Sequence, residues 1–165
     1  MEAYIIVTYV DDFFGKLARK LKIAQWTHAA IRYKENLSWR VLESTFWGIK
    51  ERGWVEFIDE KDEFVILEVI GLTPELMQKA IDYGWGNVGK PYAFHWLIKI
   101  IIRLLKERFF LPQMFHWHVC SSFVYNCIQY AGIDLIPDSK NVLVTPDELY
   151  NSELTKIVET PLTSR

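Results

Sequence analysis

The order of the predicted elements favours an α+β fold with an antiparallel sheet. Strand-like segments gather in the first half of the chain and helical segments in the second, instead of alternating. The 165-residue chain is 50% hydrophobic and 24% charged, which suits a globular domain with a large core. No repeat, low-complexity segment or linker divides it, so we expect one domain over residues 1–165.

The first half of the chain predicts strands around one helix. A β-rich run predicts a strand at Ala3–Val10, and the apolar spacing after Asp11-Asp12 predicts a capped amphipathic helix. Trp26–Tyr33 alternates apolar or small residues with polar ones, which is typical of a strand, and a polar loop follows at residues 34–38. Three further strands are expected, at Trp39–Ile49, Trp54–Ile58 and Glu63–Ile70, with Gly48 and Gly53 as breaks and Gly71 at the end of the last one.

The second half of the chain predicts helices, from their apolar spacing and their start and stop signals. They are expected from Thr73-Pro74 to about Tyr83, at Ala93–Phe109, at Val119–Tyr130 before Gly132, and from Thr145-Pro146 onward.

Charge and hydropathy narrow the classes of partner. Nineteen Lys and Arg residues against 21 Asp and Glu give a net charge of −2, which argues against a nucleic-acid binder driven by phosphate neutralisation. The most apolar stretch, Phe94–Leu105, is too short and too interrupted by Lys99 and Arg103 to span a bilayer. The N-terminus lacks the basic region and cleavage site of a signal peptide. We therefore expect a cytoplasmic protein, encoded by a cell or by a phage.

The two cysteines, Cys120 and Cys127, are expected to be free thiols with different roles. On one helix, their separation is about 10 Å, beyond the reach of a disulfide, and free thiols favour a reducing compartment. Cys120 falls at the predicted start of its helix, where unpaired amides and the helix dipole favour the thiolate. Cys127 lies two turns later among apolar residues and is interpreted as an inert core thiol. Cys120 is therefore the candidate nucleophile.

A cysteine nucleophile needs a base, and His28 is a candidate among the four histidines. It lies on a predicted strand beside small residues, which leave space for another group to approach. A base needs in turn a partner that fixes its tautomer. Glu43 interrupts an apolar run on the next predicted strand and can lie across from His28 if the two strands form a hairpin. A half-buried structural histidine and a solvent-facing glutamate are the alternatives.

Four segments, in this order, resemble the circularly permuted NlpC-type papain-like cysteine hydrolases. They are Trp26–Ile31, Val41–Ser44, Gly89–Tyr92 and Cys120–Val124. The YiiX-like proteins and the relatives of lecithin:retinol acyltransferase belong to this group. In its permuted branch the histidine strand precedes the cysteine helix, as it does here.

The resemblance implies a permuted papain-like fold, with the sheet packed against helices that include the nucleophile helix. It matches Cys120 to the nucleophile, His28 to the base and Glu43 to the orienting residue. By the same likeness, Tyr92, Thr27 and Ser121 are expected to contact substrate or to line the oxyanion site, to which the Cys120 amide would contribute. No cofactor is implied.

The resemblance suggests an amide bond in a cell-wall-type or similar small peptide as the substrate, cleaved through an acyl-enzyme. The second candidate is a hydrolase or acyltransferase that acts on a lipid ester or amide at a membrane surface. Lys99, Arg103 and Lys106 form a basic stripe on the helix expected at residues 93–109, through which the protein would contact an anionic membrane. By comparison with the family, this helix belongs to a helical insertion at about residues 93–118. A binding module without activity is the third.

Two other clusters are assigned no role. His116, His118 and Cys120 are alternate residues, which would face the same way on an extended segment, and Zn²⁺ accepts such ligands. No second cluster completes a four-ligand set, so we expect no metal. The acidic run between Glu56 and Glu63 is interpreted as a solvated turn.

Overall fold

The computed structural model describes residues 2–10, 16, 19–20, 24–45, 47–90, 114–137 and 144–160, with the side chains of the helix at 114–130 described from Cys120 onward. The helix predicted at Ala93–Phe109 lies outside the described residues, and so does most of the one predicted after Asp11-Asp12. No helix in the described ranges is long and apolar enough to cross a membrane.

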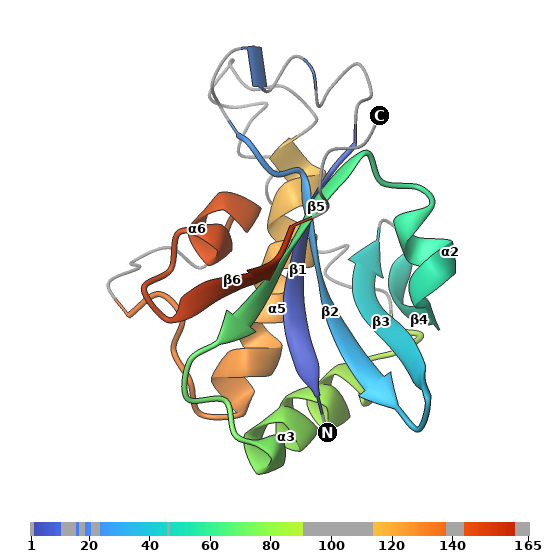
Figure 1. Cartoon of the computed structure of the whole chain (residues 1–165), viewed down its shortest axis with the longest axis vertical. Helices are drawn as coiled ribbons and strands as arrows, with labels where there is room; N and C mark the ends of the chain where they lie inside the picture. Colours follow the sequence, from blue (N-terminus) through green and yellow to red (C-terminus); the bar gives the residue numbers. More distant parts are fainter. Residues whose placement is uncertain are drawn as a thin grey trace.

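The centre of the fold is a six-stranded antiparallel sheet in the order β4-β3-β2-β1-β5-β6, which confirms the predicted α+β class (Figure 1). Sequential strands are neighbours from β1 to β4, because short hairpins join β2 to β3 and β3 to β4. The strands are β1 (Ala3–Tyr9), β2 (His28–Glu35), β3 (Ser38–Thr45), β4 (Gly48–Gly53), β5 (Glu63–Val69) and β6 (Thr155–Glu159).

Two predictions in this region were wrong, and a further strand was not predicted. The single strand expected at Trp39–Ile49 is two strands, because the chain turns at Gly48, whose φ of 117° favours glycine. Trp54–Ile58 forms a short helix, α2, in which residues three and four apart share a face and Phe57 is buried. The strand β6 was not predicted, since its residues are mostly exposed and show no clear alternation.

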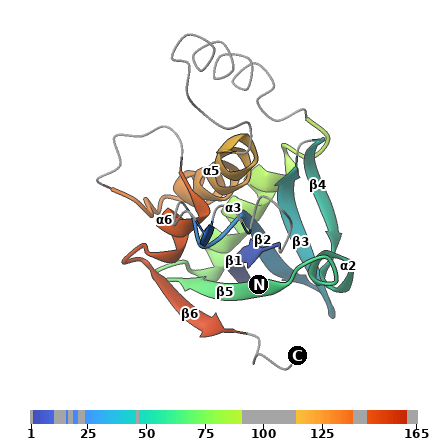
Figure 2. The same cartoon turned by 90° about the horizontal axis from the view of Figure 1, so that it is seen from above.

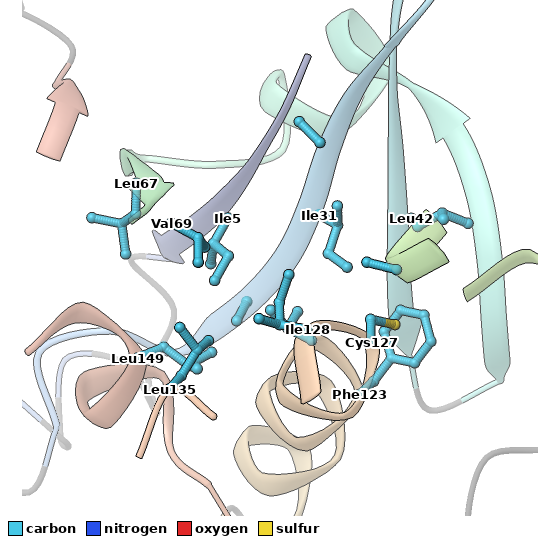
Figure 3. Close-up of a cluster of buried hydrophobic side chains, with 14 of the residues drawn as sticks. Ile5, Ile31, Leu42, Leu67, Val69, Phe123, Cys127, Ile128, Leu135 and Leu149 are labelled. Atoms are coloured by element: carbon cyan, nitrogen blue, oxygen red, sulfur yellow. The ribbon is translucent and has the colours of Figure 1, made fainter. Parts of the chain in front are cut away.

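Helices α3 (Pro74–Trp85) and α5 (Met114–Tyr130) cover one face of the sheet, with the short α6 (Pro146–Tyr150) beside them (Figure 2). Phe123, Cys127 and Ile128 of α5 pack toward Ile31 and Leu42 of the sheet in the main hydrophobic core (Figure 3). This packing fixes α5 across β2 and β3, the strands that carry the candidate base and its partner.

Helix α2 lies against the opposite face of the sheet. Its Phe57 is fully buried with Ile6, Ala30 and Val41, which come from the three central strands β1, β2 and β3. Residues opposite one another in neighbouring strands share a face, so this second cluster marks the side chains that point away from α5.

Candidate active site

The hairpin of β2 and β3 brings His28 and Glu43 together. Glu43 pairs directly with Ala30, and His28 lies two residues before Ala30, so both side chains point to the same face. The contact is therefore diagonal instead of directly across the ladder, and both side chains are long enough to span it. His28 Nε2 lies 2.9 Å from Glu43 Oε2.

Glu43 is ionised in a buried position because cations surround it. It is 1% exposed, and its Oε1 lies 2.8 Å from Arg52 Nε and 3.5 Å from Lys50 Nζ. Burial alone would raise the pKa of the carboxyl, but the hydrogen bond and charge of His28, together with Arg52 and Lys50, lower it to about 2. A carboxylate of this kind stabilises an imidazolium.

Helix α5 brings Cys120 to the other side of His28. The thiol is fully buried, and its sulfur makes a hydrogen bond with the His28 ring and accepts bonds from the backbone amides of Ala29 and Ser121. Since Nε2 of His28 faces Glu43, the nitrogen directed at Cys120 is Nδ1. The small side chain of Ala29 lies in the core beneath α5, where it lets the helix approach the strand backbone.

The charges of this triad favour a thiolate–imidazolium pair. Burial would raise the pKa of the Cys120 thiol, but the charge of His28 and the hydrogen bonds to the sulfur hold it below its ordinary value. Burial would likewise lower the pKa of His28, yet Cys120 and Glu43 raise it to about 9. The arrangement therefore presents a nucleophilic sulfur and a proton donor side by side.

The position of Cys120 in its helix corrects the sequence-based explanation of this thiolate. Helix α5 begins at Met114, so Cys120 lies six positions after its start and not at its N-terminus. The sulfur is stabilised by His28 and two amides instead of by the helix end. The oxyanion role of the Cys120 amide stays a prediction of the resemblance, because an amide within a helix faces the carbonyl four residues earlier.

The two cysteines differ as predicted. Both are free. Cys127 is fully buried in the apolar core, and burial alone raises the pKa of its thiol. Its place in the core confirms the interpretation of Cys127 as a core thiol, and its low reactivity stays a prediction.

The remaining predicted site residues hold the site's frame or lie outside the described residues. The hydroxyl of Thr27 donates to the Thr8 carbonyl at 3.3 Å and accepts from the Val10 amide at 3.3 Å, which ties the entry of β2 to β1. The hydroxyl of Ser121 is buried and donates to the Val144 carbonyl, before α6. Tyr92 lies outside the described residues, and the substrate roles of all three stay predictions.

Sequence reasoning missed the cations that balance Glu43. Lys50 pairs directly with Glu43 across the β3–β4 ladder, and Arg52 lies two residues further on the same face. The signal was the alternation Lys50-Glu51-Arg52, which becomes readable once Gly48 is recognised as a hairpin turn. Glu60 of the acidic run, to which we assigned no role, also takes part: its Oε2 lies 2.8 Å from Arg52 Nη2.

The chain places a histidine strand before a cysteine helix, and the same order appears in a known family. A family model described as permuted papain-like amidase enzyme, YaeF/YiiX, C92 family, matches residues 5–142. The chain belongs to this family. Members of the permuted papain-like amidase family are cysteine hydrolases, so the resemblance stated from the sequence is confirmed, and this chain is an enzyme of that class.

The fold agrees with a solved structure, the crystal structure of metalloprotein yiiX from Escherichia coli O157:H7. The likeness covers 96% of each chain with a TM-score of 0.68 and 17% sequence identity, which shows a shared fold. No curated protein matches the sequence.

That neighbour is described as a metalloprotein, which raises the question of a metal site here. In the described ranges, no three His, Cys, Asp or Glu side chains lie close enough together to hold a metal ion. The side chains of His116 and His118 lie outside those ranges. The described residues do not fit a metal site, and the chemistry below uses only the chain's own side chains.

Proposed function

We propose that this member of the permuted papain-like amidase family cleaves an amide bond in a small peptide, such as a cell-wall-type peptide, through Cys120, His28 and Glu43. The observation that carries the proposal is the chain of contacts from the Cys120 sulfur to the His28 ring to Glu43, with His28 Nε2 2.9 Å from the carboxylate. In acyl transfer the sulfur is the nucleophile, the His28 ring exchanges the proton, and Glu43 orients the ring and stabilises its charged form.

The reaction has two stages. The Cys120 thiolate attacks the amide carbonyl carbon, the carbon–nitrogen bond breaks, and His28 Nδ1 donates its proton to the leaving amine. Water then attacks the thioester while His28 accepts a proton from it, and the acid product leaves as the thiolate re-forms. Glu43 stays ionised and stabilises the imidazolium at both stages.

The compartment and the substrate are part of the proposal. Two free cysteines favour a reducing compartment such as the cytosol. A lipid ester or amide would use the same chemistry at the sulfur, but the basic stripe that suggested it lies outside the described residues. The substrate panel should therefore contain both a γ-linked wall-type peptide and an acylated lipid.

The test combines activity with a direct view of the thiolate. Because Cys120 is fully buried, the ultraviolet absorbance of the thiolate is a better readout than alkylation, which also depends on access. We expect wild-type absorbance to rise well below the ordinary thiol pKa of about 8.5, and this rise to be absent in Cys120→Ala and displaced upward in His28→Ala. The Cys127→Ala variant is the control and should retain it.

Hydrolysis of the peptide should fall by about a thousandfold or more in Cys120→Ala and His28→Ala. Turnover that survives Cys120→Ala would contradict the proposed nucleophile. Turnover of the acylated lipid and not of the peptide would replace the substrate class and keep the site.

A further inference from the structure

Glu43 has a second buried partner besides His28, and this partner is itself held in place. Arg52 on β4 places its Nε 2.8 Å from Glu43 Oε1 and its Nη2 2.8 Å from Glu60 Oε2. Its side chain is 6% exposed, and its Cζ lies 5.0 Å from the centre of the Phe57 ring. A planar guanidinium held from three sides keeps one orientation.

The two oxygens of Glu43 have separate partners. Oε2 contacts His28, and Oε1 contacts Arg52, so the rotation of the carboxylate is fixed from both ends. Although Arg52 Nε and Glu43 Oε1 are 2.8 Å apart, they make no hydrogen bond with each other, and neither atom makes one with another described residue. Their contact is thus one of charge, and its geometry depends on Glu60 holding the other side of the guanidinium.

The other charged groups that face Glu43 are weaker candidates for this task. Lys50 lies opposite on β4, but its Nζ is 3.5 Å from Oε1 and its side chain is 49% exposed, so water competes for it. Lys61 places its Nζ over the Phe57 ring, 5.0 Å from the ring centre, instead of against the Glu43 carboxylate. Glu56 and Glu60 lie beside Arg52 and carry the same charge as Glu43. Arg52 is therefore the buried cation beside Glu43 in the described part of the chain.

We propose that Arg52 is a positioning residue of this site: it holds the Glu43 carboxylate against His28 Nε2, so that Nδ1 stays directed at the Cys120 sulfur. Arg52 acts through Glu43, whose Oε1 it contacts. The inference rests on the proposed function, because the position of His28 matters for catalysis only if His28 works on Cys120. It also gives the acidic run a role, since Glu60 anchors Arg52.

Two possible roles of Arg52 predict opposite shifts in the titration of His28. If Arg52 contributed only a positive charge, its removal would stabilise the imidazolium and raise the pKa of His28. If it positions Glu43, its removal releases the carboxylate from the ring, and the pKa of His28 falls from about 9 toward its ordinary value of 6.5. The ring signal of His28 in NMR, identified by its loss in His28→Ala, reports which shift occurs.

We expect Arg52→Gln to lower the pKa of His28 by about one pH unit or more. Arg52→Lys keeps the charge but not the planar fork, so it should shift the titration in the same direction. In a Glu43→Gln background, adding Arg52→Gln should cause no further change, because the effect passes through Glu43. Turnover should fall roughly tenfold with KM unchanged, since a charged contact is lost away from the substrate.

Arg32→Gln is the matched control. Arg32 pairs across the ladders with Val41, as Arg52 does, so the two arginines share a face. Its side chain is 11% exposed and its Nη1 lies 3.3 Å from Glu159 Oε2. Its removal should leave the titration of His28 unchanged, and urea unfolding verifies that each variant is folded.

The outcomes separate the two proposals. A pKa of His28 that is unchanged or raised in both Arg52 variants, with the thiolate intact, overturns the positioning role alone. A further shift when Arg52→Gln is added to Glu43→Gln overturns it as well. An ordinary titration of His28 in the wild-type protein overturns the proposed function and this inference together.

Discussion

Replacing Glu43 by Gln tests how strongly the buried charges hold the site together. The carboxylate side chain is 2% exposed and that of its partner Arg52 is 6% exposed. Glu43→Gln takes the carboxylate from Arg52 and from the His28 imidazolium together. Although Glu60 stays beside Arg52, breaking a buried ion pair in this way costs about 3–5 kcal/mol. With a urea m-value of about 2 kcal/mol/M, the unfolding midpoint should fall by about 1.5–2.5 M.

Glu159→Gln is the control for this measurement. It removes the partner of Arg32, but the Glu159 side chain is 55% exposed and its Oε2 lies 3.3 Å from Arg32 Nη1. Exposed ion pairs contribute about 0–1 kcal/mol, so the midpoint should move by less than about 0.5 M.

The two shifted pKa values determine how the free energy of unfolding depends on pH. The pKa of Glu43 is lowered from 4.5 to about 2, so its contribution to stability is complete above pH 4.5 and is lost as the pH falls through 2. The pKa of His28 is raised from 6.5 to about 9, so its contribution is complete below pH 6.5 and is lost as the pH rises through 9. Wild type and Glu43→Gln should therefore differ most between pH 4.5 and 6.5. A loss as small as that of the control, or a loss that stays the same from pH 2 to pH 9, would refute the reasoning.

Three further predictions concern the frame around the site. Gly84→Ala should destabilise the protein by roughly 1–3 kcal/mol in urea unfolding, because the new Cβ would meet Leu42 Cδ1 at 3.1 Å. Gly53→Ala is the control and should not destabilise it, because no atom lies within 4 Å of the new Cβ. Equal losses of stability in the two variants would contradict this. Ser121→Ala should cost about 1–3 kcal/mol in the same assay, because it leaves the Val144 carbonyl without its buried donor, and a neutral result would show that the bond is not needed. Glu51→Gln should lower the free energy of unfolding by about 1.5–3 kcal/mol in thermal unfolding, because its carboxylate is 9% exposed and accepts hydrogen bonds from Arg40 and Tyr33. Glu2→Gln, whose side chain is 53% exposed, should be close to neutral, and similar values for the two variants would count against this network.

The sequence was informative wherever a local pattern decides the structure. The apolar run of β1, the capping residue and proline that begin α3, and the apolar spacing of α5 all depend on neighbours within a few residues. The candidate nucleophile and base were found in the same way, since a histidine on a strand and a cysteine among helical apolar residues are local anomalies. The family likeness then related them by their order in the chain.

Sequence reasoning failed where the deciding contact is distant. Trp54–Ile58 has the composition of a strand, but it is a helix because Phe57 fills the face made by Ile6, Ala30 and Val41. The start of α5 at Met114 was missed for lack of a clear capping signal, and so were the groups that lower the pKa of the Cys120 thiol.

The sequence by itself determined which side chains are the candidates for acyl transfer and that they lie on a strand, its neighbour and a helix. Only the tertiary structure decided how they meet: the register of β2 and β3 makes the contact of His28 with Glu43 diagonal, and the packing of α5 on the sheet brings Cys120 to Nδ1. The charge that surrounds Glu43 was decided there too, because Arg52 and Glu60 reach it from a strand and a turn that only the fold places side by side. Protonation states follow from burial and from neighbouring charges, and both are properties of the packed molecule.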